Sequence, residues 1–110
     1  MKIIDIAGLK SPGGESATFQ GFEYGAGVSF FVVESSSGKG PAKHRHPYEE
    51  TFVIFEGQIE VIVDDQAHLV GGGQIVIIPA NTWHEFKVRS DGKVFMVNLH
   101  PVPKMITEWA

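Results

Sequence analysis

The 110-residue chain contains no cysteine. Disulfides, thiolate metal sites and cysteine nucleophiles are therefore excluded, and any metal must be held by nitrogen and oxygen atoms. Long apolar runs are also absent. No stretch approaches the roughly 18 residues that a membrane span needs, and the first residues lack the apolar core of a signal peptide. We therefore expect a soluble, cytoplasmic protein without a membrane partner.

Positive charge is sparse. The chain has 9 Lys and Arg against 13 Asp and Glu, with a formal net charge of -4, and its basic residues are scattered rather than clustered. This distribution gives no basic field for a phosphate backbone, so nucleic acid is not expected as a partner. The length suits one compact core, and we expect a single domain over residues 1–110.

No stretch shows a helical apolar period with caps. Instead, short runs rich in Val, Ile and Phe alternate with turn residues such as Asp64-Asp65 and Gly71-Gly72-Gly73. A spacing of about 8–12 residues is typical of a β-sandwich or barrel. For the tail, residues 101–110, a short helix and a packed strand both remain open. The pattern predicts an all-β domain, with strands at residues 17–22, 28–34, 51–56, 58–63, 66–70, 74–78, 84–89 and 94–99.

Three histidines and one glutamate form the most informative pattern. His44 and His46 flank Arg45, Glu50 follows after three residues, and His84 lies far downstream. Residues two apart in a strand face the same way, so His44 and His46 project together while Arg45 points away. The spacing would allow two strands of a barrel to bring these side chains to one point. The pattern therefore predicts a divalent metal site.

The surroundings of His84 indicate that it faces the interior. Phe86 and Val88 share its face of the strand, whereas charged residues occupy the other face. A buried polar group without a partner costs about 1–3 kcal/mol, and a shared metal would supply that partner. Because side chains alternate along a strand, Phe52 and Ile54 lie on the same inward face of their strand as Glu50. We therefore expect an apolar substrate pocket formed by Phe52, Ile54, Phe86 and Val88.

These residues resemble the two motifs of the cupin superfamily. The first motif, with its glycines, His-x-His and Glu, matches over residues 38–57, and the second matches over residues 73–88 at Gly73, Pro79 and His84. Asn81 stands where glycine is usual, and Asn enters the left-handed region more readily than most residues. Val88 stands where asparagine is usual. This difference removes a polar group from the interior but changes none of the expected metal ligands. Residues 58–72 resemble the short hairpin between the motifs of small bacterial cupins.

The resemblance implies a double-stranded β-helix, or jelly-roll barrel, with a metal in the cavity near one end. It also implies that His44, His46, Glu50 and His84 are the ligands. Three imidazoles and a carboxylate suit Fe, Mn, Ni, Co, Cu or Zn, and do not suit an all-oxygen calcium site. Four protein ligands on a metal that prefers six leave two positions for water, dioxygen or a bidentate substrate. Glu50 could instead leave the metal and act as a general base.

Cupins with this ligand set include dioxygenases, isomerases, decarboxylases, lyases and binding proteins. A phosphosugar enzyme would need inward basic groups, yet the parity places Lys43, Arg45, Lys87 and Arg89 outward. Our first hypothesis is a metal-dependent oxygenase or related enzyme that acts on a small enolisable or aromatic substrate. The alternatives are a non-catalytic small-molecule-binding or sensory cupin, and a metal-dependent isomerase or lyase.

The remaining polar and aromatic residues carry weaker signals. Trp83 could fill a packing gap or form a substrate platform, and we interpret Trp109 as an anchor for the tail. A barrel this small leaves edge strands and an apolar sheet face, so we also expect a homodimer. We interpret Glu49 and His68 as solvated. Asn98 and His100 could reach the mouth of the pocket, but a structural role is favoured for both.

Overall fold

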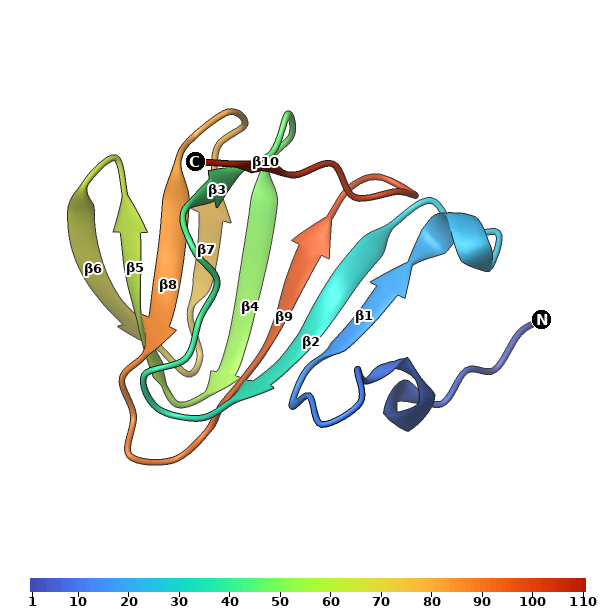
Figure 1. Cartoon of the computed structure of the whole chain (residues 1–110), viewed down its shortest axis with the longest axis horizontal. Coiled ribbons are helices and arrows are strands. Elements are labelled where there is room, and N and C mark those ends of the chain that lie inside the picture. Colours follow the sequence, from blue (N-terminus) through green and yellow to red (C-terminus); the bar gives the residue numbers. More distant parts are fainter.

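The computed structural model describes residues 1–110 and contains two five-stranded antiparallel sheets (Figure 1). The first sheet has the order β1 (Ala17–Gln20), β2 (Ser29–Ser35), β9 (Val94–His100), β4 (Glu50–Glu56) and β7 (Ile75–Ile78). The second has the order β10 (Glu108–Trp109), β3 (His44–Arg45), β8 (His84–Val88), β5 (Gln58–Val63) and β6 (Gln66–Gly71). The all-β, double-stranded β-helix expected from the sequence is confirmed.

Two short 3-10 helices, η1 (Ile6–Leu9) and η2 (Gly21–Glu23), complete the chain. No helix combines the length and the apolar character required for crossing a bilayer. The predicted strand 17–22 was too long, because the chain leaves the sheet at Gly21. A Cβ at that position would lie 2.2 Å from the Ala26 carbonyl oxygen, so glycine permits this close approach.

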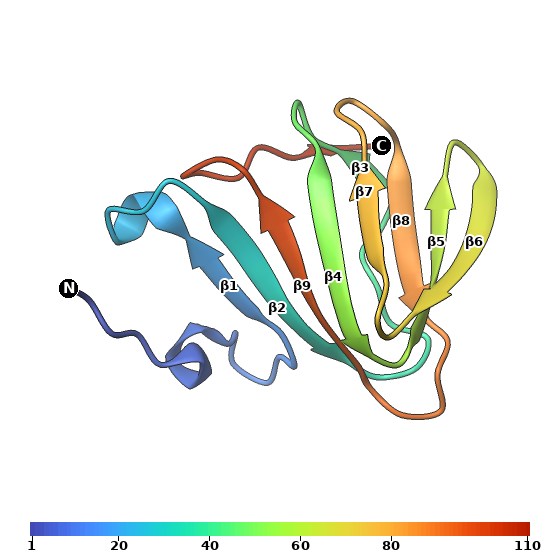
Figure 2. The same cartoon turned by 180° about the vertical axis from the view of Figure 1, so that it is seen from behind.

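Alternation along the strands builds the core. In β9, Val94 and Met96 point inward and are buried, whereas Phe95 between them is exposed. Apolar residues of both sheets meet in the same way and form one core cluster of Val33, Phe52, Ile54, Ile59, Val61, Ile78, Phe86, Val88, Val94 and Met96. At one end of this interior the buried side chains become polar, and this end carries β3 and the C-terminal segment (Figures 1 and 2).

Two turns confirm the conformations suggested by the sequence. Asp64 and Asp65 have φ of 49° and 63°, as a tight hairpin between β5 and β6 requires. Asn81 has φ of 59°, so it adopts the left-handed conformation that glycine has in the usual motif. The Asn81 N–H also donates a 2.7 Å hydrogen bond to the His46 carbonyl. This bond holds the segment before β8 against the segment that follows β3.

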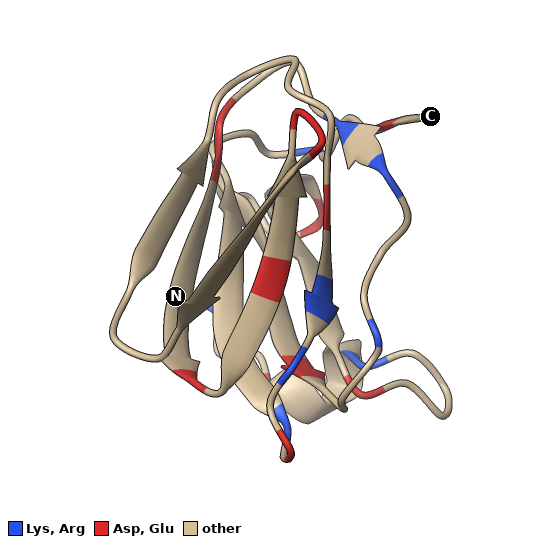
Figure 3. Cartoon of the chain, turned by 90° about the vertical axis from the view of Figure 1, so that its left-hand side faces the viewer, with Lys and Arg blue, Asp and Glu red and all other residues tan.

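Charged residues are spread over the loops and strands of the chain (Figure 3). Arg45, on the outward face of β3, pairs with Glu108 on β10 at 2.9 Å and lies 4.3 Å above the Trp83 ring. These contacts occupy the Trp83 ring on the outside of the sheet. Within residues 101–110 only Glu108–Trp109 form a strand, paired with β3, and no helix is present.

Candidate metal centre

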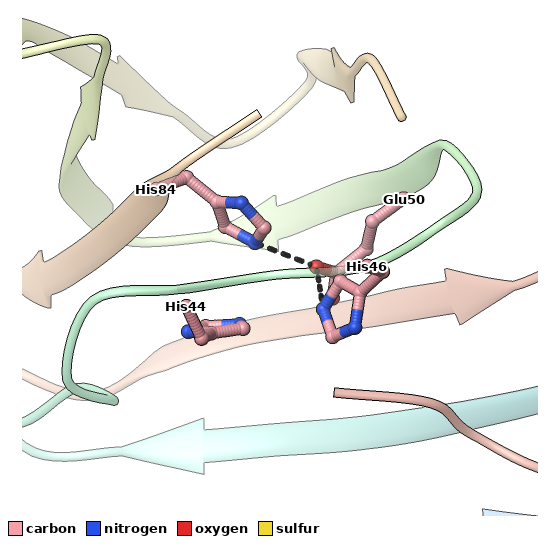
Figure 4. Close-up of side chains that lie close together, drawn as sticks. All are labelled: His44, His46, Glu50 and His84. Carbon is pink, nitrogen blue, oxygen red and sulfur yellow. Dashed lines mark hydrogen bonds and ion pairs between the residues drawn. The ribbon is translucent and has the colours of Figure 1, made fainter. Parts of the chain in front are cut away.

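Four side chains from three places in the chain meet at the polar end of the interior (Figure 4). His44 lies on β3 and pairs in register with His84 at the start of β8. His46 follows β3 directly, and Glu50 opens β4. One potential ligand atom from each residue lies within 4.8 Å of all the others, and all four residues are buried. The structure thus brings together the four residues selected from the sequence.

Each of the three histidines is oriented by a backbone carbonyl. The Nδ1 atom of each lies 2.7–2.8 Å from a carbonyl oxygen. His44 contacts Ala42, His46 contacts Ile106, and His84 contacts Thr82. A carbonyl oxygen only accepts, so every Nδ1 must carry the hydrogen. In the neutral imidazole the Nε2 lone pair is then free, which is the state required of a metal ligand.

The Glu50 carboxylate lies close to two of these nitrogens. Its Oε1 lies 3.0 Å from His84 Nε2 and 3.2 Å from His46 Nε2. Imidazole lone pairs facing a carboxylate oxygen repel it unless a positive charge lies between them. His46 Nε2 is also buried without a hydrogen-bond partner. The donor set, its tautomers and this unpaired nitrogen therefore fit a divalent transition metal.

The electrostatics of the cluster favour an ionised carboxylate. Burial raises the pKa of Glu50, but contacts with His100, His46 and His84 outweigh this and hold the pKa well below its usual range. Burial lowers the pKa of His44. For His46, burial has the same sign, but the Glu50 carboxylate outweighs it and raises the pKa. Glu50 is consequently anionic at neutral pH and available to a cation.

His100, for which the sequence favoured a structural role, is a fifth member of the cluster. Its Nε2 lies 3.1 Å from Glu50 Oε2, and its Nδ1 lies 2.6 Å from the Tyr48 hydroxyl. The tautomer in which Tyr48 donates to Nδ1 leaves the hydrogen on Nε2, which lies beside Glu50 Oε2 without forming a hydrogen bond to it. His100 thus lies against the oxygen of Glu50 that is not shared by His46 and His84. The signal available in the sequence was its inward parity in β9.

A cavity of about 280 Å³ lies over the cluster. Its apolar walls include Phe52 and Phe86, as the sequence analysis predicted, together with Phe31, Val33 and Trp109. Ile54 and Val88 do not line it, because each lies two residues farther along its strand, within the core. Ligand pockets commonly measure about 300–1,000 Å³, so this cavity suits a small molecule.

The polar lining of the cavity is neutral apart from the metal cluster. Ser16, Ser35, Asn98 and Thr107 contribute to it, whereas no Lys or Arg does. Trp109, interpreted as a tail anchor, lies over His44 with ring centroids 5.0 Å apart and also lines the cavity. Glu49 and His68 are exposed and do not line the cavity.

The family model described as "Cupin domain" matches residues 23–100. The chain is 38% identical over 64 residues to quercetin 2,3-dioxygenase from Bacillus subtilis, an alignment that covers 56% of this chain and 19% of that protein. It is 36% identical over 61 residues to Protein SchB from Streptomyces halstedii, covering 54% of this chain and 44% of that protein. The chain therefore spans less than half the length of either relative.

Solved structures share the fold at low sequence identity. A double-stranded β-helix domain protein from Klebsiella pneumoniae has a TM-score of 0.78 and 17% identity, covering 99% of this chain and 91% of that chain. Oxalate decarboxylase from Lactobacillus farciminis, solved as a formate complex, has a TM-score of 0.76 and 19% identity, covering 86% of this chain and 30% of that chain. At these identities the likeness concerns the fold alone.

Proposed function

Because this chain belongs to the cupin family, we propose that it is a metal-dependent oxygenase or related enzyme acting on a small enolisable or aromatic molecule. One observation carries the proposal: three oriented imidazoles and an ionised carboxylate converge, and His44, His46 and Glu50 line a small cavity whose apolar residues are mostly aromatic. His44, His46, Glu50 and His84 would hold the metal. When bound, a divalent metal supplies Lewis acidity toward substrate oxygens, and iron adds the capacity to use dioxygen.

The chain's own residues would bind and shield the substrate. Phe52 and Phe86 meet edge to face, with ring centroids 5.6 Å apart, and give the cavity a rigid apolar wall. Trp109 stands beside His44, where it can limit the access of water. Glu50 remains ionised, so it can also accept a proton if it leaves the metal.

The absence of basic side chains from the lining argues against phosphorylated substrates, because a phosphate group would enter without a cation other than the metal. The local similarity to a quercetin 2,3-dioxygenase supports an aromatic, oxygen-bearing substrate. An isomerase or lyase reaction would use the same ligands, and the native metal distinguishes it from an oxygenase. Iron favours oxygen chemistry, whereas nickel or manganese keeps the other reactions open.

The test begins with elemental analysis of protein purified without added metal. The protein is then loaded anaerobically with Fe(II), Mn(II), Ni(II) or Zn(II) and mixed with a panel of diketones, flavonols and catechols. We expect oxygen consumption with at least one substrate, together with a product detectable by mass spectrometry. A failure of every metal-loaded form to turn over any substrate would contradict the proposal. Tight binding of an unchanged molecule would instead support the non-catalytic alternative.

Two histidine variants make this test specific. His84→Ala removes a buried imidazole from the cluster, so metal content and turnover should both be lost while the barrel remains folded. His68→Ala removes an exposed imidazole from β6 and should retain both. Far-UV circular dichroism checks the fold of each variant. Full metal occupancy in His84→Ala would remove His84 from the ligand set.

A further inference from the structure

Asn98 is a buried polar residue for which the protein provides no partner. Its side chain is only 3% exposed, and its amide oxygen makes no hydrogen bond. The residue nevertheless lines the cavity together with Glu50 and Phe52. Buried polar atoms are paired in the great majority of cases, and exceptions concentrate where a ligand or water completes the pairing. As placed, the amide oxygen is itself enclosed. A half-turn of the amide, which exchanges its oxygen and nitrogen, turns the oxygen towards the cavity, where a donor from outside the protein can pair with it.

The position of Asn98 relates it to the metal centre. Along the inward face of β9, Asn98 lies two residues from His100, which contacts the Glu50 carboxylate. Two residues of strand span roughly 6.6 Å, so the amide lies one side-chain layer away from the metal cluster. Across the sheet, Asn98 pairs in register with Phe31 on one side and Phe52 on the other. Neither neighbour can donate a conventional hydrogen bond.

We propose that Asn98 determines specificity by accepting a hydrogen bond from a substrate that chelates the metal through two oxygens and carries a further hydroxyl group. This inference rests on the proposed function, because the metal fixes one end of the substrate. The Asn98 amide oxygen, one side-chain layer from the metal, accepts a hydrogen bond from that hydroxyl. The aromatic walls contact the flat part of the substrate between the metal and Asn98. A substrate that lacks the donor leaves the buried oxygen unpaired and therefore binds less tightly.

The test uses two ligands that differ by a single hydroxyl group. Kojic acid and allomaltol share the same hydroxypyranone chelating pair, but kojic acid has a hydroxymethyl arm where allomaltol has a methyl group. Binding to the Zn(II)-loaded protein is measured by isothermal titration calorimetry, because zinc has no redox chemistry of its own. We expect the wild type to prefer kojic acid by about five- to tenfold, the usual effect of one hydrogen bond.

Three variants locate the acceptor. Asn98→Leu keeps a similar volume without an acceptor, so the two ligands should bind equally. Asn98→Asp keeps an acceptor oxygen and should keep the preference. Thr107→Val removes a hydroxyl that lines the same cavity and lies 3.4 Å from His46 Nδ1; any effect through His46 applies to both ligands, so this variant should also keep the preference. Thermal melting and zinc content verify that each variant is folded and loaded before binding is compared.

Equal binding of both ligands to the wild type would overturn the role of Asn98 while leaving the metal centre intact. The role of Asn98 would also be overturned if Asn98→Leu still preferred kojic acid, or if only Thr107→Val lost this preference. If neither ligand binds the zinc-loaded protein, the proposed chelation fails, and the inference fails with it. The calorimetric result thus separates a failure at Asn98 from a failure of the proposed function.

Discussion

The Tyr48 hydroxyl joins three segments that are distant in the sequence. It contacts His100 Nδ1 at 2.6 Å and accepts the Ile106 N–H at 3.1 Å, and the Ile106 carbonyl in turn accepts from His46. His100 then contacts Glu50 Oε2 at 3.1 Å. Tyr48 therefore acts on the cluster through His100 and Ile106 and touches neither Glu50 nor a ligand nitrogen by any hydrogen bond. It is a positioning residue.

Tyr48→Phe should lower metal affinity by about tenfold, because removing outer-shell hydrogen bonds commonly costs 10–100-fold. The ring remains, so packing against His46, stacked at 5.3 Å between centroids, should be preserved. Competition with a metallochromic chelator measures the affinity. Tyr24→Phe is the matched control, since Tyr24 stacks on Phe19 far from the cluster. Equal metal affinity in the wild type and Tyr48→Phe would argue against this positioning role.

Metal retention should depend on pH in one direction. A protonated imidazole has no lone pair at Nε2, so protons compete with the metal and affinity falls as pH decreases. The Glu50 carboxylate raises the pKa of His46, although burial opposes it, so His46 takes up a proton more readily than an ordinary histidine. Burial lowers the pKa of His44, which delays its protonation. Retention should therefore decline below about pH 6.5.

Dialysis of the metal-loaded protein at a series of pH values, followed by elemental analysis, measures this decline. Circular dichroism at each pH separates metal release from unfolding. Undiminished metal content down to about pH 5 would contradict the assignment of imidazole ligands.

At the scale of elements, Glu15 ties the start of β1 to two loops. Its carboxylate contacts the Ser36 hydroxyl, Lys39 at 2.7 Å and Lys93 at 3.4 Å. The Lys39 contact, followed by that with Ser36, lowers the pKa of Glu15 to about 2. Because Ser36 and Lys39 belong to the loop that leads into β3, this carboxylate helps to fix the approach to His44.

Glu15→Gln should lower the melting temperature at neutral pH. The folded pKa lies below the ordinary value of 4.5, so the ionised carboxylate stabilises the fold above that pH, and this contribution is lost as pH falls towards 2. The difference in melting temperature between wild type and variant should therefore shrink over this interval, and added salt should also reduce it. Glu34→Gln, which loses one 4.0 Å contact with Lys10, is the control. A difference that stays constant from pH 7 to pH 2 would contradict the assignment.

Strands with several alternating residues could be predicted from the sequence, and β5 was predicted to its end residues. β3 and β10 could not, because two residues carry no period, and their pairing joins Arg45 to Glu108 across most of the chain. The four cluster residues could be identified because motif spacing reports them directly. His100 and Tyr48 were missed because their contact connects the end of β9 to the loop before β4, which no local pattern encodes.

On the scale of the whole molecule, the outer face of the first sheet is apolar. Phe55, Ile75 and Ile77 are more than half exposed, and Phe95 and Leu99 more than a third. Thr51 of β4 lies in register between Ile77 of β7 and Leu99 of β9. Val53 of β4 lies in the same way between Ile75 and Val97. None of these side chains is charged. Glu34 and Glu56, which pair in register with Phe95, are charged residues at one end of this face. Its uncharged part can meet its own copy without like-charge contacts, so we propose that it forms an isologous homodimer interface.

Light scattering at micromolar concentration should give the mass of a dimer. Ile77→Lys should shift the protein towards monomer, because a two-fold interface would bring the introduced charge close to its copy. Leu69→Lys changes a similarly exposed apolar residue on the other sheet and should leave the dimer intact. A monomeric wild type would contradict the proposal, and so would loss of the dimer in Leu69→Lys alone.

The hydrogen bond from His46 Nδ1 to the Ile106 carbonyl connects the C-terminal segment to the metal centre. Thermodynamic linkage makes this connection reciprocal: an ordered tail favours the ligand orientation of His46, and a metal on Nε2 favours the docked tail by the same factor. The resistance of residues 106–109 to proteolysis should therefore rise with metal content, although none of them supplies a ligand atom.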